Sequence, residues 1–106
     1  MSLDKIELVD AVGTEKNTGT IVLNLLDAWD WNDERRHLLA LQGKLNVYFE
    51  FVESGQIYEE YPTAVGRPLR IDILSRYPVP AVVRPFLEEA AKVAAQLNIG
   101  ITQRTA

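Results

Sequence analysis

The stretch WDWNDERRHLLALQGKLNVYFEFVESGQIYEEYP, residues 29–62, decides the fold because it predicts one long helix between two strand-forming regions. It contains both tryptophans, the single histidine and most of the aromatic residues. We expect the helix over residues 31–54, which at 1.5 Å per residue would be about 36 Å long. Asp30 or Asn32 is expected to cap its N-terminus, and Gly55 is expected to end it.

Apolar residues recur along this helix at three- and four-residue steps and predict a buried stripe. Further apolar residues widen the stripe beyond one face. We therefore expect the helix to contact a sheet on one side and another helix, or a second subunit, on another side. The stripe consists of Leu38, Leu41, Leu45, Tyr48 and Val52.

Strands are predicted on both sides of the helix. Residues 5–12 and 20–27 are apolar with rough alternation and are separated by turn-forming residues, so residues 5–27 predict a hairpin. Residues 67–77 alternate clearly between apolar and polar side chains and predict a third strand.

A second helix is predicted over residues 81–98, with a loose first turn before Pro85. Residues 56–66 are expected to be an irregular connector, and residues 99–101 are compatible with a short C-terminal strand. We therefore expect a single α+β domain over residues 1–106. It is predicted to be a two-layer sandwich in the order β-β-α-β-α, with both helices on one face of the sheet.

Composition limits the classes of function. The net charge is −4 and the basic residues are scattered, which argues against nucleic acid as a partner because phosphate binding requires clustered Lys and Arg. The absence of cysteine excludes disulfides, thiolate zinc sites and a cysteine nucleophile. The N-terminal sequence lacks a signal-peptide pattern, and no apolar run approaches the roughly 20 residues of a membrane span. We expect a cytoplasmic protein without a membrane partner.

Few residues suit catalysis or metal binding. His37 is the only histidine and no nucleophile elbow accompanies it, so a packed or partly exposed helix residue is the expected role. The acidic residues between Asp27 and Glu34 supply oxygen ligands for Mg²⁺ or Ca²⁺ but lack the spacing of a calcium loop. Helix capping accounts for them. We therefore predict no catalytic residue, no cofactor and no metal.

Aromatic and polar residues near the two ends of the long helix form a candidate binding surface. Tryptophans at a helix start are commonly core residues, but aromatic residues are also enriched in protein interfaces. The two tyrosines either line a groove or fasten the connector to the core. The candidate residues are Trp29, Asp30, Trp31, His37, Tyr58 and Tyr61.

Four motifs resemble those of a family of small bacterial proteins of unknown function. They are V-D-x-[IV]-G at residues 9–13, L-L-D-x-x-D-W at residues 25–31, H-L-x-x-L-Q-x-K-[LI]-N-x-Y at residues 37–48 and F-[IV]-E-S-G-x-[IL]-Y-E-x-Y-P at residues 51–62. The resemblance covers nearly the whole chain. It implies a self-contained fold and supplies no catalytic residues.

Three functions follow from these observations. The first is a non-enzymatic interaction or accessory domain, with a homodimer formed through the apolar surface of the long helix or through the second face of the sheet. The second is a ligand-binding or catalytic protein with a pocket between Trp29/Trp31 and Tyr58/Tyr61, where Asp30 or His37 supplies the polar group. The third is an immunity- or antitoxin-like inhibitor, because the acidic charge suits a basic partner.

Overall fold

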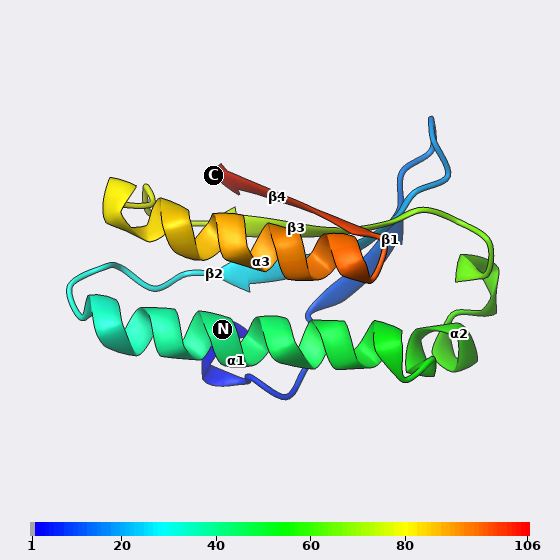
Figure 1. Cartoon of the computed structure of the whole chain (residues 1–106), viewed down its shortest axis with the longest axis horizontal. Helices are drawn as coiled ribbons and strands as arrows, with labels where there is room; N and C mark the ends of the chain where they lie inside the picture. Colours follow the sequence, from blue (N-terminus) through cyan, green and yellow to red (C-terminus); the bar gives the residue numbers. More distant parts are fainter. Residues whose placement is uncertain (1) are drawn as a thin grey trace.

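The computed structural model describes residues 2–106, and Met1 lies outside the described residues. It combines a four-stranded sheet with helices, as the predicted α+β class requires (Figure 1). The strands are β1 (Ala11–Thr14), β2 (Ile21–Asp27), β3 (Leu69–Ser75) and β4 (Ile99–Thr105). The α-helices are α1 (Glu34–Glu53), α2 (Gln56–Glu60) and α3 (Arg84–Gln96). The short 3₁₀ helices are η1 (Ser2–Asp4), η2 (Pro62–Ala64) and η3 (Ala81–Val83).

The strands lie in the sheet in chain order, β1-β2-β3-β4. β1 pairs antiparallel with β2, whereas β2, β3 and β4 are all parallel. Two crossover connections join the parallel strands: the one from β2 to β3 contains α1, and the one from β3 to β4 contains α3. Such crossovers are right-handed, and these two run in the same direction across the sheet, so α1 and α3 lie on the same face. The C-terminal ends of the three parallel strands therefore meet at one edge of the sheet, which we call the carboxyl edge.

One sheet face is apolar and covered by the helices. Matched rows across β2, β3 and β4 place Ile21, Leu69 and Ile99 side by side, and the next rows repeat this apolar character. These side chains belong to one hydrophobic cluster that also contains Leu41, Leu45 and Tyr48 of α1 and Ala90 and Ala94 of α3. The last row of this face is polar and consists of Asp27, Ser75 and Thr105.

The long helix differs from its prediction at its start. It begins at Glu34, and Asp33 is the N-cap because its carboxylate accepts the backbone N–H of Arg36 at 3.2 Å. Asp30 instead accepts the N–H of Asn32 and stabilises the loop before the helix. The helix ends as predicted at Gly55, whose φ of +84° is left-handed.

Three further predictions require correction. Residues 5–10 are not part of a hairpin strand, because β1 begins at Ala11. Residues 56–66 are not irregular but contain α2 and η2. The C-terminal strand is seven residues long and forms one edge of the sheet, so with α2 included the order is β-β-α-α-β-α-β. The loose turn before Pro85 is confirmed as η3, and α3 itself begins at Arg84.

A buried lysine holds the N-terminal segment against α1. Lys44 is fully buried, and its Nζ donates to the carbonyl oxygens of Lys5 and Leu8, each at 2.8 Å. It also forms an ion pair with Asp10 at 2.9 Å. The other oxygen of Asp10 accepts the N–H of Leu26 on β2, so this cluster joins the segment, the helix and the sheet.

Candidate functional site

The carboxyl edge contains a buried histidine–aspartate pair. Asp27 ends β2 and His37 lies in the first turns of α1, and their side chains are both 1% exposed. Nε2 of His37 lies 2.5 Å from Oδ2 of Asp27, and Nδ1 lies 2.9 Å from the carbonyl oxygen of Asp30. Because a carbonyl oxygen only accepts, Nδ1 carries a proton and donates it to Asp30. Both ring nitrogens are therefore used within the protein.

The two tryptophans pack around this histidine. The Trp31 ring stacks on the imidazole with centroids 3.5 Å apart, and Trp29 meets it edge-on at 5.8 Å. The second oxygen of Asp27 accepts the N–H of Trp29 at 3.1 Å. The Asp27–His37 pair thus fixes the β2–α1 loop on which Trp29 and Asp30 are carried.

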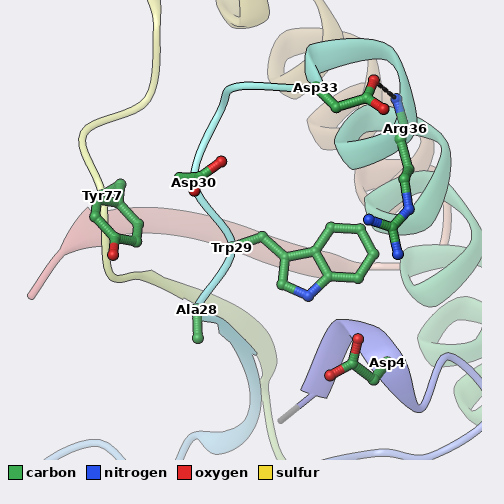
Figure 2. A pocket seen from close by; sticks show the side chains of 7 residues that line it. All are labelled: Asp4, Ala28, Trp29, Asp30, Asp33, Arg36 and Tyr77. Carbon is green, nitrogen blue, oxygen red and sulfur yellow. Dashed lines mark hydrogen bonds between the residues drawn. The ribbon is translucent and has the colours of Figure 1, made fainter.

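An open hollow of about 340 Å³ lies beside this loop. Its walls come from the β2–α1 loop, the first turn of α1, η1 and the segment after β3. Figure 2 shows Trp29 in the middle of the hollow, with Arg36 against its ring on one side and Tyr77 on the other. The lining residues are Asp4, Ala28, Trp29, Asp30, Asp33, Arg36 and Tyr77.

The charge of this hollow, which we call the edge pocket, is predominantly negative. The pocket is lined by one guanidinium, that of Arg36, and by the three carboxylates of Asp4, Asp30 and Asp33. Its net charge is therefore −2. The Arg36 guanidinium carbon lies 4.5 Å from the centroid of a Trp29 ring, a distance typical of a cation–π contact. Arg36 forms no ion pair with any of these carboxylates within the described residues.

The structure brings together four of the six predicted binding-surface residues. Trp29 and Asp30 line the edge pocket, whereas Trp31 and His37 lie behind it as structural support. Tyr58 lies in α2 and Tyr61 is the C-cap of that helix, which follows the other end of α1 (Figure 1). Tyr61 lines a separate hollow of about 240 Å³ with residues that include Val12, Phe51 and Gln56. A single pocket formed by the tryptophans and the tyrosines is therefore wrong.

Sequence reasoning missed several residues of this region. No sequence motif marks Arg36 as a site residue, and Asp4 and Tyr77 are remote from His37 in the chain. Tyr77 follows β3, and the parallel pairing of β2 and β3 brings the ends of both strands to the same edge. That direction of pairing is the missing information, because loops after adjacent parallel strands commonly form binding sites.

No group of three or more His, Cys, Asp or Glu side chains in residues 2–106 is arranged to hold a metal ion. The acidic residues between β2 and α1 instead accept backbone N–H groups: Asp27 from Trp29, Asp30 from Asn32 and Asp33 from Arg36. Each carboxylate thus has a role in the loop that does not require a cation. No helix among the same residues is long and apolar enough to cross a membrane.

The chain belongs to the family of unknown function DUF6572, whose model matches residues 1–106. No curated protein and no solved structure matches the chain.

Proposed function

We propose that this protein is a non-catalytic binding domain whose edge pocket holds a basic segment of a partner protein. The observation that carries the proposal is the combination of three carboxylates with Trp29 and Tyr77 in one open hollow. Carboxylates attract an ammonium or guanidinium group, and aromatic faces bind the same groups through cation–π contacts.

The contact between Arg36 and Trp29 supports this choice of ligand. It is an intramolecular example of the proposed interaction, since a guanidinium already lies over the indole ring. Leu39 of α1 is 58% exposed and lines an adjoining hollow with Trp29 and Arg36, which extends the surface beyond the pocket. Tryptophan, tyrosine and arginine are also the residue types most enriched at energetic centres of protein interfaces.

The Asp27–His37 pair argues against a catalytic role. A general base needs a ring nitrogen that can reach a substrate, but both nitrogens of His37 have internal partners and the ring is 1% exposed. The pair instead orients the loop that carries Trp29. It acts on binding only through the position of that loop.

The proposal is tested by isothermal titration calorimetry with a capped tetra-arginine peptide as the probe and a capped tetra-glutamate peptide as its negative control. Asp4→Asn combined with Asp30→Asn is expected to weaken tetra-arginine binding about tenfold, which corresponds to about 1.4 kcal/mol. The matched control, Glu53→Gln with Glu59→Gln, removes the same charge from exposed positions outside the pocket. It should change the affinity less than twofold.

Arg36→Gln sharpens the test because it removes the internal cation from the indole ring. We expect tighter tetra-arginine binding in this variant, with Arg35→Gln as the control for general charge, since Arg35 is exposed and lies outside the edge pocket. Equal effects of the pocket and control variants would overturn the proposal and indicate general attraction to an acidic surface.

A further inference from the structure

A second hollow adjoins the segment that follows β3. Its volume is about 260 Å³, and α3, β4 and this segment form its walls. Tyr77 lines the edge pocket, whereas the next two residues, Pro78 and Val79, line the second hollow. Both hollows therefore lie at the carboxyl edge and share one segment of the chain. We call the second one the Arg84 hollow, and it is lined by Pro78, Val79, Arg84, Leu87, Gln103 and Thr105.

The charge of the Arg84 hollow is opposite to that of the edge pocket. Arg84 is the only charged residue among the described residues that line it, so its net charge is +1. Within residues 2–106 Arg84 is exposed and forms no ion pair, not even with Glu88 one turn further along α3. In a chain of net charge −4, an unpaired guanidinium in a hollow favours an anionic ligand.

Two polar side chains of β4 add hydrogen-bond donors to this guanidinium. The amide nitrogen of Gln103 donates one hydrogen to the hydroxyl of Ser75 at 3.1 Å, which leaves its second N–H available. The Thr105 hydroxyl has no hydrogen-bond partner within the described residues. These donors match the two oxygens of a carboxylate, and one positive charge balances its single negative charge. A phosphate group would bring nearly two negative charges.

The separation of the two hollows matches the length of a short peptide. Asp27, Ser75 and Thr105 are in register at the ends of β2, β3 and β4. Because neighbouring strands are about 4.8 Å apart, the end of β2 lies about 10 Å from the end of β4. Ala28 follows β2 and lines the edge pocket, whereas Thr105 lines the Arg84 hollow. An extended segment of three residues spans about 10 Å and can reach from one hollow to the other.

We propose that the basic segment bound in the edge pocket is the C-terminus of the partner, and that Arg84, Gln103 and Thr105 bind its terminal carboxylate. This inference rests on the proposed function, since the edge pocket holds the cationic side chains of the same segment. The segment crosses the carboxyl edge from the end of β2 to the end of β4. The opposite charges of the two hollows fix its direction. An internal basic segment has no terminal carboxylate, so the Arg84 hollow selects for chain ends.

Two tetra-arginine peptides that differ only at the C-terminus test this inference by isothermal titration calorimetry. One is the capped peptide, and the other has the same acetylated N-terminus but a free C-terminal carboxylate. The free acid has the lower positive charge, so general attraction to an acidic protein predicts that it binds more weakly. We expect it instead to bind about tenfold more tightly, because its carboxylate forms charge-assisted hydrogen bonds with Arg84.

Arg84→Gln should reduce the preference for the free acid to less than twofold. Since Arg84 is exposed, the variant should fold normally and bind the capped peptide within twofold of the wild-type affinity. The matched control is Arg104→Gln, which removes the same charge from an exposed position of β4 that does not line the hollow. This control should retain the tenfold preference.

A third peptide, a capped tetra-arginine with one added glutamate at its C-terminal end, carries the extra carboxylate on a side chain. It should bind less tightly than the free acid. Tighter binding of this peptide would assign the hollow to an acidic side chain and overturn the assignment to a chain end.

The remaining outcomes separate this inference from the proposed function. The inference alone fails if the free acid binds no more tightly than the capped peptide while Asp4→Asn with Asp30→Asn still weakens capped-peptide binding. It also fails alone if Arg84→Gln retains the preference for the free acid. A capped peptide that does not bind, or that binds the Asp4 and Asp30 variant as tightly as wild type, would overturn the proposed function and with it the inference.

Discussion

Helix α1 carries two buried polar clusters, two turns apart, that differ in what they hold in place. At His37 the cluster consists of the histidine, Asp27 and Trp31, and it fixes the loop that forms one wall of the edge pocket. At Lys44 the cluster contains the lysine, Asp10 and the hydroxyl of Tyr48, and it holds the N-terminal segment against the sheet. The His37 cluster supports a surface that is open to solvent, whereas the Lys44 cluster lies between the N-terminal segment, α1 and β2.

This difference shows how the same type of interaction can serve stability or binding. Both clusters remove charge from water, and each requires a partner that compensates for the lost hydration. The Asp27–His37 pair holds the loop that carries Trp29 and Asp30 of the edge pocket, whereas the segment held by Lys44 contributes only Asp4 to that pocket. Substitutions in both clusters should therefore lower stability, and those at Asp27 and His37 should change ligand binding more than those at Lys44.

The largest effect is expected for Lys44→Met, which keeps the aliphatic stem and removes the charge. Asp10 and two backbone carbonyl oxygens then lose a buried donor. Removal of one partner of a buried pair costs about 3–5 kcal/mol. Urea unfolding followed by circular dichroism measures this loss. At a temperature where the variant is folded, tetra-arginine affinity should fall less than in Asp27→Asn, because only Asp4 of the edge pocket lies in the segment that Lys44 holds. A larger loss of affinity than in Asp27→Asn would contradict the division between the clusters.

A smaller loss of stability is expected for Asp27→Asn. The amide retains the shape of the side chain but removes the charge that faces Nε2 of His37, at a cost of about 2 kcal/mol for a charge-assisted hydrogen bond. Because Asp27 also accepts the N–H of Trp29, the loop should loosen and tetra-arginine binding should weaken. Unchanged binding in this variant would show that the pair contributes stability alone.

For Tyr48→Phe, the loss in the free energy of unfolding relative to wild type should depend on pH. The hydroxyl donates to the carbonyl oxygen of Asn24 at 2.5 Å and accepts the N–H of Asp10 at 2.9 Å, so its removal should cost about 1 kcal/mol at pH 7. Burial raises the pKa of Tyr48 well above its ordinary value. The folded protein thus favours the neutral phenol, and this stability is present below pH about 10 and is lost as the pH rises toward the folded-state pKa.

The free energy of unfolding of wild type and Tyr48→Phe should therefore converge above pH about 10, because phenylalanine has no proton to lose. Urea unfolding at pH 7 and at alkaline pH measures the two differences. A difference that grows with pH would contradict this account.

The smallest effect is expected on the sheet face opposite the helices, where Asp72 pairs with Arg70, whose side chain is partly exposed and also pairs with Glu15. Burial acts to raise the pKa of Asp72, but hydrogen bonds from Arg70 and Thr102 outweigh it and the pKa is lowered. The stability from this carboxylate is present above its unfolded pKa of about 4 and is lost as the pH falls through the lower folded value. Asp72→Asn should cost less than about 1 kcal/mol at pH 7, and the cost should disappear in acid. Thermal unfolding from pH 7 down to pH 2 checks this.

Helix periodicity and strand alternation predicted which residues face the core. The pattern in residues 67–77 placed Leu69, Ile71 and Ile73 on one face, and the structure buries all three. In α1 the buried positions Leu41, Leu45 and Val52 were likewise predicted from their spacing.

The buried polar residues were harder to predict because their burial depends on partners distant in the chain. Lys44 lies within the apolar stripe of α1, three residues after Leu41. A charged residue at such a position is the sequence feature that indicates a buried lysine. Its partner Asp10 is 34 positions earlier, and no local pattern connects the two. The edge pocket was missed for a similar reason, since Tyr77 reaches Trp29 only through the parallel pairing of β2 and β3.

The most direct test of the proposed function is a titration of ¹⁵N-labelled protein with the capped tetra-arginine peptide, followed at the two indole N–H signals. Trp29 lies in the edge pocket, whereas the Nε1 atom of Trp31 is buried beside His37. Binding at the edge pocket should shift the Trp29 signal in a saturable manner together with the backbone signals of Asp30 and Tyr77. The Trp31 signal should move much less. A titration in which Trp29 does not respond, or in which the largest shifts fall near Tyr61, would contradict the account.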